Sequence, residues 1–114
     1  MSERIIETEF QQKAEQAILD LERAFGELAE VRDLDVQVQG GVLTVSFEEG
    51  EPGKFIVSPN SSVRQLWVSA RMTSSKLGWS NDENAFVLSG TSETLNQLMT
   101  RLTREQLQDD AVEL

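Results

Sequence analysis

The strongest constraint in this sequence is a pair of glycines between two runs of alternating apolar and polar residues, at positions 34–47. Adjacent glycines supply the positive backbone angles of a two-residue turn, so this stretch is predicted to form an antiparallel hairpin. Folding the chain about Gly40 and Gly41 places three apolar pairs opposite one another: Leu34 and Phe47, Val36 and Val45, and Val38 and Leu43. These side chains share one face, which we expect to be covered, whereas the polar residues between them face solvent.

Length and composition narrow the functional classes. A chain of 114 residues is expected to form a single domain over residues 1–114. The chain has no cysteine and no histidine, so disulfides, structural zinc and thiolate catalysis are excluded, and carboxylates remain as the strong metal ligands. The net charge of -10 argues against nucleic acid and anionic membranes as partners, and favours cations or a basic protein surface. The acidic start of the chain has no targeting pattern and no long apolar run follows, so we expect a soluble, cytoplasmic protein.

Amphipathic helices are predicted at both ends of the chain. The first covers residues 6–28, and its apolar residues recur every three or four positions: Ile6, Phe10, Ala14, Ala17, Leu21, Phe25 and Leu28. The second is expected to be capped by Thr91 or Ser92. Its predicted buried side consists of Leu95, Leu98, Met99, Leu102 and Leu107.

Short strands are predicted between the hairpin and the second helix, at residues 55–58, 64–70, 76–79 and 85–88. Pro59 is expected to end the first of them, and turn residues separate the others. A run of strands between two terminal helices predicts an α+β fold. We expect a two-layer sandwich, in which an antiparallel sheet of five to six strands carries both helices side by side on its apolar face. The opposite face would be open to solvent.

Trp67 is a candidate binding residue. Its neighbours Leu66 and Val68 take the apolar register of their strand, so Trp67 is expected on the open face. Exposed tryptophans are enriched at the centres of protein interfaces, which points to partner contact. A cross-strand packing partner is an equally open interpretation, because single exposed aromatic residues are common. Trp79 shares a register with Leu77, and one of the two is expected to be buried.

Carboxylates concentrate in the first third of the chain, and several lie away from the apolar stripe of the first helix. Acids in the last turn of a helix oppose its dipole at a cost of about 0.3–1 kcal/mol each, and sequences tend to break such rules at functional sites. Exposed carboxylates suit iron, manganese, calcium or magnesium, with an affinity on the order of 10⁻⁵ M or weaker because nothing encloses the ion. The alternative is a solvated face that keeps the protein soluble, and residue types alone favour it.

The run GGVLTVSF, the later run QLWVSA, a strand ending in an aromatic residue and a closing helix together resemble the frataxin family over roughly residues 19–107. The resemblance implies a helix, sheet, helix fold and an iron-binding accessory protein of iron–sulfur cluster assembly, which acts with a cysteine desulfurase and a scaffold protein. It implies weak binding of Fe²⁺ or Fe³⁺ by an acidic ridge that maps to Asp20, Glu22, Glu27, Glu30, Asp33 and Asp35. It implies partner contacts at Asn60, Gln65, Trp67 and Lys76. Arg23 and Arg32 place positive charges among the ridge residues.

Three classes of function therefore stay open. The preferred one is the iron-binding accessory protein, expected to be a monomer unless metal drives it to form oligomers. The second is a small acidic binding module without a metal role, such as a secretion-type chaperone, which would be a dimer. The third, an enzyme, is not expected, because no carboxylate lies in an apolar segment that would raise its pKa. Slow oxidation of bound iron by oxygen is the one reaction that such a carboxylate site would support.

Overall fold

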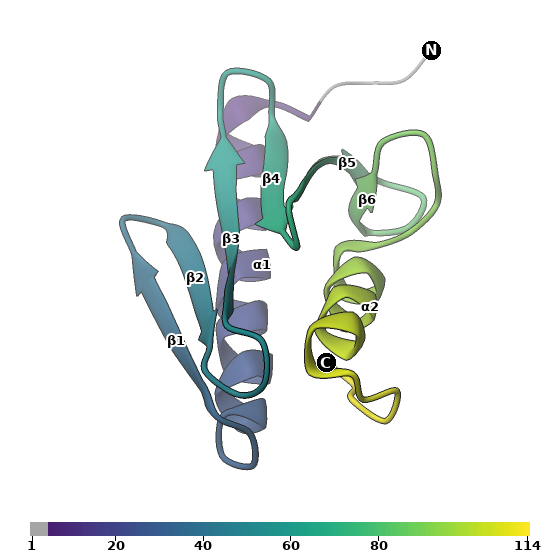
Figure 1. Ribbon diagram of the computed structural model, residues 1–114. Coiled ribbons are helices and arrows are strands. Elements are labelled where there is room, and N and C mark those ends of the chain that lie inside the picture. Colours follow the sequence, from purple (N-terminus) through teal and green to yellow (C-terminus); the bar gives the residue numbers. More distant parts are fainter. Residues whose placement is uncertain (1–4) are drawn as a thin grey trace.

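The computed structural model describes residues 5–114, and the first four residues of the acidic opening segment lie outside the described residues. A helix comes first, then six strands and a second helix (Figure 1). Their bounds are α1 Glu7–Leu28, β1 Leu34–Gln39, β2 Val42–Phe47, β3 Gly53–Asn60, β4 Gln65–Ala70, β5 Thr73–Ser80, β6 Ala85–Leu88 and α2 Leu95–Leu107. The strands form one antiparallel sheet in chain order, so β1 and β6 are its edges.

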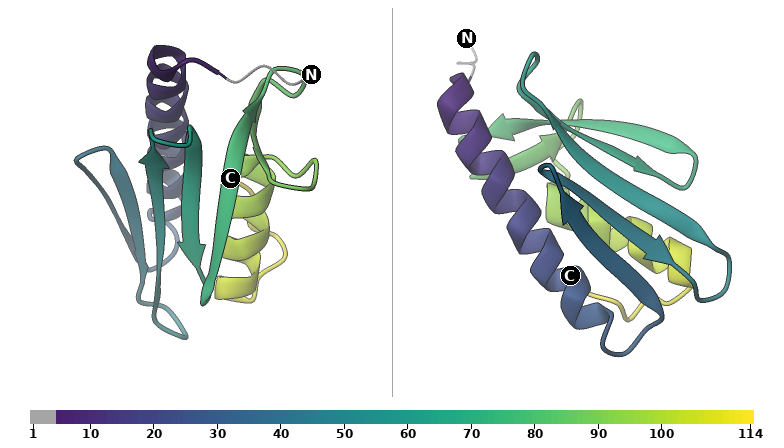
Figure 2. Two further views of the ribbon diagram at one scale, coloured as in Figure 1. Left: turned by 90° about the horizontal axis from the view of Figure 1, so that it is seen from above. Right: turned by 90° about the vertical axis from the view of Figure 1, so that its left-hand side faces the viewer.

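The two helices lie against the sheet as separate rods (Figure 2), with α1 packed on β1, β2 and β3, and α2 packed on β6. The side chains between sheet and helices form one hydrophobic cluster. Aromatic rings contribute to it: the ring centroids of Phe47 and Phe55 are 4.7 Å apart, and Trp79 meets Phe86 edge-on at 5.2 Å. Leu77 and Trp79 share a register, and one of them was expected to be buried. Leu77 is the buried residue. The predicted α+β sandwich is confirmed.

The hairpin has the predicted register. Gly40 and Gly41 have φ angles of 61° and 79°, the left-handed values that a two-residue turn requires. Leu34 pairs with Phe47, and the other two predicted apolar pairs also lie opposite one another. Alternation and turn chemistry within fourteen residues were therefore sufficient to determine which face of the hairpin is covered.

The apolar stripe of α1 is largely as predicted. The buried positions include Ile18, which the predicted stripe lacked: Phe10, Ala14, Ile18, Leu21 and Phe25. The expectation for Ile6 was wrong, because Ile6 precedes the first helical residue and is 58% exposed. Neither helix in the described part of the chain is long and apolar enough to span a membrane.

Several strand ends differ from the prediction. Pro59 was expected to end β3, but the strand continues through it to Asn60. At Pro59, β3 has already run past its last paired position with β2, where Leu43 lies opposite Val57. A residue without an N–H is tolerated beside such a free edge. β4 and β5 start at Gln65 and Thr73, because the chain turns at residues with positive φ that are not glycine: Arg64, Arg71 and Met72. Such residues give no turn signal in the sequence.

The cap of α2 was also predicted wrongly. The capping residue is Thr94, whose side chain accepts a hydrogen bond from the backbone N–H of Gln97 while the Gln97 side chain accepts one from the N–H of Thr94. This is a capping box. Thr91 and Ser92 lie too early, because the chain turns at residues 89–91 and runs back along β6 before the helix starts. The N–H of Leu88 donates to the carbonyl oxygen of Glu93, and Thr94 bridges to Val87.

Candidate functional site

The sheet face that the helices leave open carries Trp67 near its centre. The side chain of Trp67 is on the face opposite to the buried Leu66 and Val68, and the residue is 37% exposed. Its Nε1 donates a hydrogen bond to Oε1 of Gln65 at 3.1 Å. On the neighbouring strand, Lys76 lies opposite Trp67, and its Nζ is 5.1 Å from the centroid of the indole ring. The indole is thus flanked by an amide and a cation on one open surface.

Asn60 completes this group, because it pairs with Gln65 on the neighbouring strand. Its Oδ1 accepts a hydrogen bond from the backbone N–H of Ser62, which shapes the turn between β3 and β4. The sheet therefore brings together all four residues of the predicted partner contact, Asn60, Gln65, Trp67 and Lys76, which we call the open-face patch. Whether they bind a partner stays a prediction.

Ile56 is an exposed apolar residue of the open face that the sequence reasoning missed. It is 38% exposed, between Phe55 and Val57, which are both buried. Strict alternation along residues 55–57 was the signal that could have identified it. Ile56 pairs with Ser69 of β4, two residues from Trp67, so it enlarges the apolar part of this surface.

The six predicted metal-ligating carboxylates, which we call the acidic set, do not form one continuous row. All are exposed except Glu22, which is half-buried. Asp20 lines a cleft of about 410 Å³ between α1 and α2, together with Lys13 and Trp79. Glu22 follows two residues later, so it points about 160° away around the helix, toward the β1 side. Asp33 and Asp35 belong to the loop after α1 and to β1.

Within residues 5–114, no group of three carboxylates comes together in a way that could hold a metal ion. Of the two arginines expected among the ridge residues, Arg32 acts elsewhere, because it forms ion pairs with Glu49 and Asp109. Asp20 accepts a hydrogen bond from Gln16 at 2.9 Å. The arrangement offers exposed, separate carboxylates, which suit weak and hydrated cation binding better than an enclosed site.

Among residues 5–114, two carboxyl groups have a clearly shifted pKa. Hydrogen bonds from Arg32 lower the pKa of Glu49, and hydrogen bonds from Arg101 lower that of Glu93. A general acid near neutral pH needs a raised carboxyl pKa, so neither group is suited to that role. Glu49 and Glu93 serve as ion-pair partners that hold loops and α2 in place.

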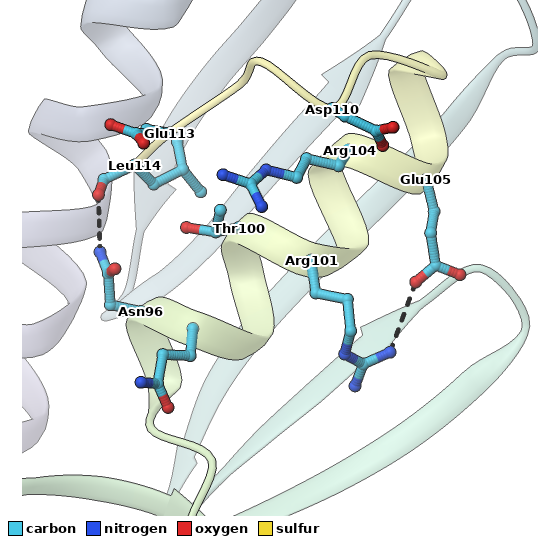
Figure 3. A pocket seen from close by; sticks show the side chains of 9 residues that line it. Asn96, Thr100, Arg101, Arg104, Glu105, Asp110, Glu113 and Leu114 are labelled. Carbon is cyan, nitrogen blue, oxygen red and sulfur yellow. Dashed lines mark hydrogen bonds and ion pairs between the residues drawn. The ribbon is translucent and has the colours of Figure 1, made fainter.

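A hollow of about 700 Å³ lies between α2 and the C-terminal tail (Figure 3). Its two arginines are already bound by the protein's own groups. Nε of Arg104 donates to the carbonyl oxygen of Val112 at 2.6 Å, and Arg101 pairs with Glu93 and Glu105. Figure 3 also shows the side chain of Asn96 directed at the carbonyl oxygen of Leu114, at 3.0 Å. The contacts of Arg104 and Asn96 hold the tail in place, and the guanidinium of Arg101 is engaged by Glu93 and Glu105.

Comparison with known proteins gives a consistent result. The family model for the frataxin-like domain matches residues 3–109. The iron-sulfur cluster assembly protein CyaY of Pseudomonas aeruginosa is 37% identical over 78 residues, which cover 68% of this chain and 70% of that protein. The protein of the same name from Stutzerimonas stutzeri is 36% identical over 74 residues, covering 65% of this chain and 66% of that protein.

A solved structure has the same fold. The frataxin of Psychromonas ingrahamii superposes with a TM-score of 0.78 at 19% identity, and the match covers 92% of this chain and 94% of that one. At this identity the likeness concerns the arrangement of helices and strands.

Proposed function

Because the chain belongs to the frataxin-like family, we propose that it is an accessory protein of iron–sulfur cluster assembly, which carries iron weakly and docks on the assembly complex. Relatives that are more than a third identical to it bear the name iron-sulfur cluster assembly protein CyaY. The proposed partners are the cysteine desulfurase and the scaffold protein of cluster assembly. In this role iron is the cargo of the protein and not a resident cofactor.

The observation that carries this proposal is the open-face patch. An indole that is 37% exposed lies between the amide of Gln65 and the ammonium of Lys76, in the middle of a sheet face that no element of residues 5–114 covers. Aromatic side chains surrounded by hydrogen-bonding groups are typical of the centres of protein interfaces. A rigid sheet also presents the indole in a fixed orientation, which reduces the entropy lost on binding. These features support docking through the open face.

The acidic set supports the iron part of the proposal. Exposed carboxylates on α1, the following loop and β1 attract cations to a protein whose net charge is -10. Since these carboxylates are spread over opposite sides of α1, we propose several weak iron positions, with affinities on the order of 10⁻⁵ M or weaker. Weak binding is adequate for an ion that is to be passed on or sensed.

An anaerobic ferrous titration followed by backbone NMR tests the iron binding. We expect paramagnetic broadening to be confined to residues 20–35. Reversing three charges, as in Glu27→Lys, Glu30→Lys and Asp33→Lys together, should abolish broadening around those positions. The matched control reverses three exposed acids elsewhere, Asp82, Glu83 and Glu113, and thus changes the net charge equally. Equal loss in both variants would mean that iron responds only to net charge, and the iron proposal would be wrong.

Docking is tested separately with Trp67→Ala, by measuring binding to the desulfurase–scaffold complex. We expect weaker binding with the fold unchanged. Met72→Ala is the control, because Met72 is a fully exposed apolar residue in the turn between β4 and β5, away from the open-face patch. Unchanged binding by the Trp67 variant would contradict docking through this face.

The competing function is an acidic binding module without a metal role. The lack of a three-carboxylate group within residues 5–114 favours it over a dedicated metal site. A secretion-type chaperone would be a dimer, so a monomer in sedimentation experiments, combined with local iron broadening, distinguishes our proposal from this alternative.

A further inference from the structure

The two edges of the sheet differ in how far they are covered. The β6 edge is short and covered by the protein's own chain, because Thr94 bridges to Val87 and the N–H of Leu88 donates to the carbonyl oxygen of Glu93. The β1 edge is six residues long, and no other strand of residues 5–114 lies beyond it (Figure 2, right). One edge is therefore closed, and the other is free to accept a further strand.

The register shows which backbone groups this free edge presents. In an antiparallel pair, opposite residues alternate between exchanging both hydrogen bonds and exchanging none. The N–H of Glu48 donates to the carbonyl oxygen of Asp33, so the bonded pairs continue at Asp35, Gln37 and Gln39. The N–H and C=O groups of Val36 and Val38 consequently point outward. They form an unpaired row on which a strand could add.

Apart from one charged residue, the sequence of β1 has none of the features that usually blunt an edge. Proteins commonly protect edge strands with proline, lysine or a bulge. β1 reads LDVQVQ, and its pairing with β2 is continuous over six positions. Among its side chains only Asp35 is charged, and it is exposed on the open face of the sheet.

The surroundings of the edge specify the side chains that an added strand would carry. On the helix side, Leu19 is 45% exposed. A groove of about 510 Å³ runs from Leu19 and Val38 past the hairpin turn to Pro59, and its lining mixes apolar residues with Gln11, Glu15 and Ser61. On the open face, Asp35 would lie beside the added strand. Since side chains alternate between the two faces of a strand, the fitting segment alternates apolar and basic residues.

We infer that the edge of β1 binds an extended segment of a basic partner protein by strand addition, with the apolar side chains of the segment against Leu19 and Val38 and its basic side chains beside Asp35. Main-chain hydrogen bonds to Val36 and Val38 would provide the affinity, and the alternating side chains the specificity. A second copy of this chain is disfavoured as occupant, because each copy has a net charge of -10 and would bring its own Asp35 to the interface. This inference does not depend on the proposed iron binding or on the open-face patch.

The test uses a synthetic peptide with four Lys-Val repeats, blocked at both ends, and titrates it into the full-length protein followed by NMR. We expect shift changes confined to residues 34–40 and slower hydrogen exchange at the amides of Val36 and Val38. Backbone N-methylation then separates pairing from charge. All lysine amides of an extended peptide point to one side and all valine amides to the other. Methylation of one set should therefore weaken binding about tenfold or more through lost hydrogen bonds, and methylation of the other set should not.

Two variants complete the test. Val36→Pro removes an outward N–H that the hairpin itself does not use, so the fold should persist while peptide affinity falls about tenfold or more. Val36→Ala shortens the same side chain but keeps the N–H, so it should bind nearly as well as the parent protein. Equal effects of the two methylated peptides, equal affinities of the two variants, shifts confined to the open-face patch, or a β1-mediated dimer in sedimentation would each overturn the inference.

Discussion

Arg32, in the loop after α1, donates a hydrogen bond from Nη1 to Oδ2 of Asp109, which follows α2, at 2.7 Å. The same guanidinium pairs with Glu49, in the loop between β2 and β3. One side chain thus joins three segments at one end of the sandwich, across sequence separations of 17 and 77 residues. This network fixes how the helical layer meets the sheet at that end.

Glu49→Gln is expected to reduce the free energy of unfolding at neutral pH and to have little effect in acid. Hydrogen bonds from Arg32 hold the pKa of Glu49 below its usual value of 4.5. Below pH 4.5 the unfolded chain therefore binds more protons at Glu49 than the folded protein does. The stabilisation that Glu49 provides is complete above this pH, and it is lost as the pH falls through the lowered pKa of the folded state. Urea unfolding at a series of pH values from neutral to acid measures the effect. The exposed neighbour Glu48, changed to Gln, controls for the loss of charge, and a pH-independent difference would contradict the prediction.

Truncating two adjacent residues of β4 is expected to reduce the free energy of unfolding by very different amounts. Leu66 is fully buried, so Leu66→Ala should cost about 2–5 kcal/mol of unfolding free energy. Trp67→Ala should cost about 1 kcal/mol or less, because the indole faces solvent and contacts mainly Gln65 and Lys76. Chemical denaturation of both variants measures the difference. Comparable losses would show that the indole packs like a core residue.

Thr94→Ala is expected to destabilise the protein by about 0.5–2 kcal/mol, because it removes the capping side chain of α2. Ser92→Ala is the matched control, since Ser92 is exposed and was the wrongly expected cap. Its effect should stay within about 0.5 kcal/mol. Thermal unfolding of the two variants, compared at equal pH and salt, decides which residue caps the helix.

The C-terminal tail is expected to contribute to stability through Val112. Val112 is 6% exposed, and its backbone carbonyl oxygen accepts a hydrogen bond from Arg104. Val112→Ala removes two buried methyl-sized groups, so we expect a loss of about 1.6 kcal/mol, at about 0.8 kcal/mol for each. Glu113→Ala, an exposed neighbour, should leave the urea midpoint nearly unchanged. If Val112→Ala also leaves the urea midpoint unchanged, the tail does not pack against the rest of the protein in solution.

The sequence by itself determined the features that depend on neighbours a few residues apart. Glycines at positions 40 and 41, with alternating residues on either side, specified the hairpin, its register and its covered face. Alternation of apolar and polar residues along β4 likewise placed Trp67 on the open face. The spacing of Phe10, Ala14, Leu21 and Phe25 specified the buried side of α1. Periodicity and turn chemistry are local, so they can be read without coordinates.

Only the tertiary structure decided where distant segments meet. The cap moved to Thr94 because the preceding residues pair with the edge of β6, and Arg32 bonds to residues that its own neighbourhood does not reveal. The acidic set was divided because α1 turns Asp20 toward α2 and Glu22 toward β1, and helix packing alone determines what lies on each side. Contacts over long sequence separations depend on how the helices pack against the sheet, and no local sequence pattern encodes them.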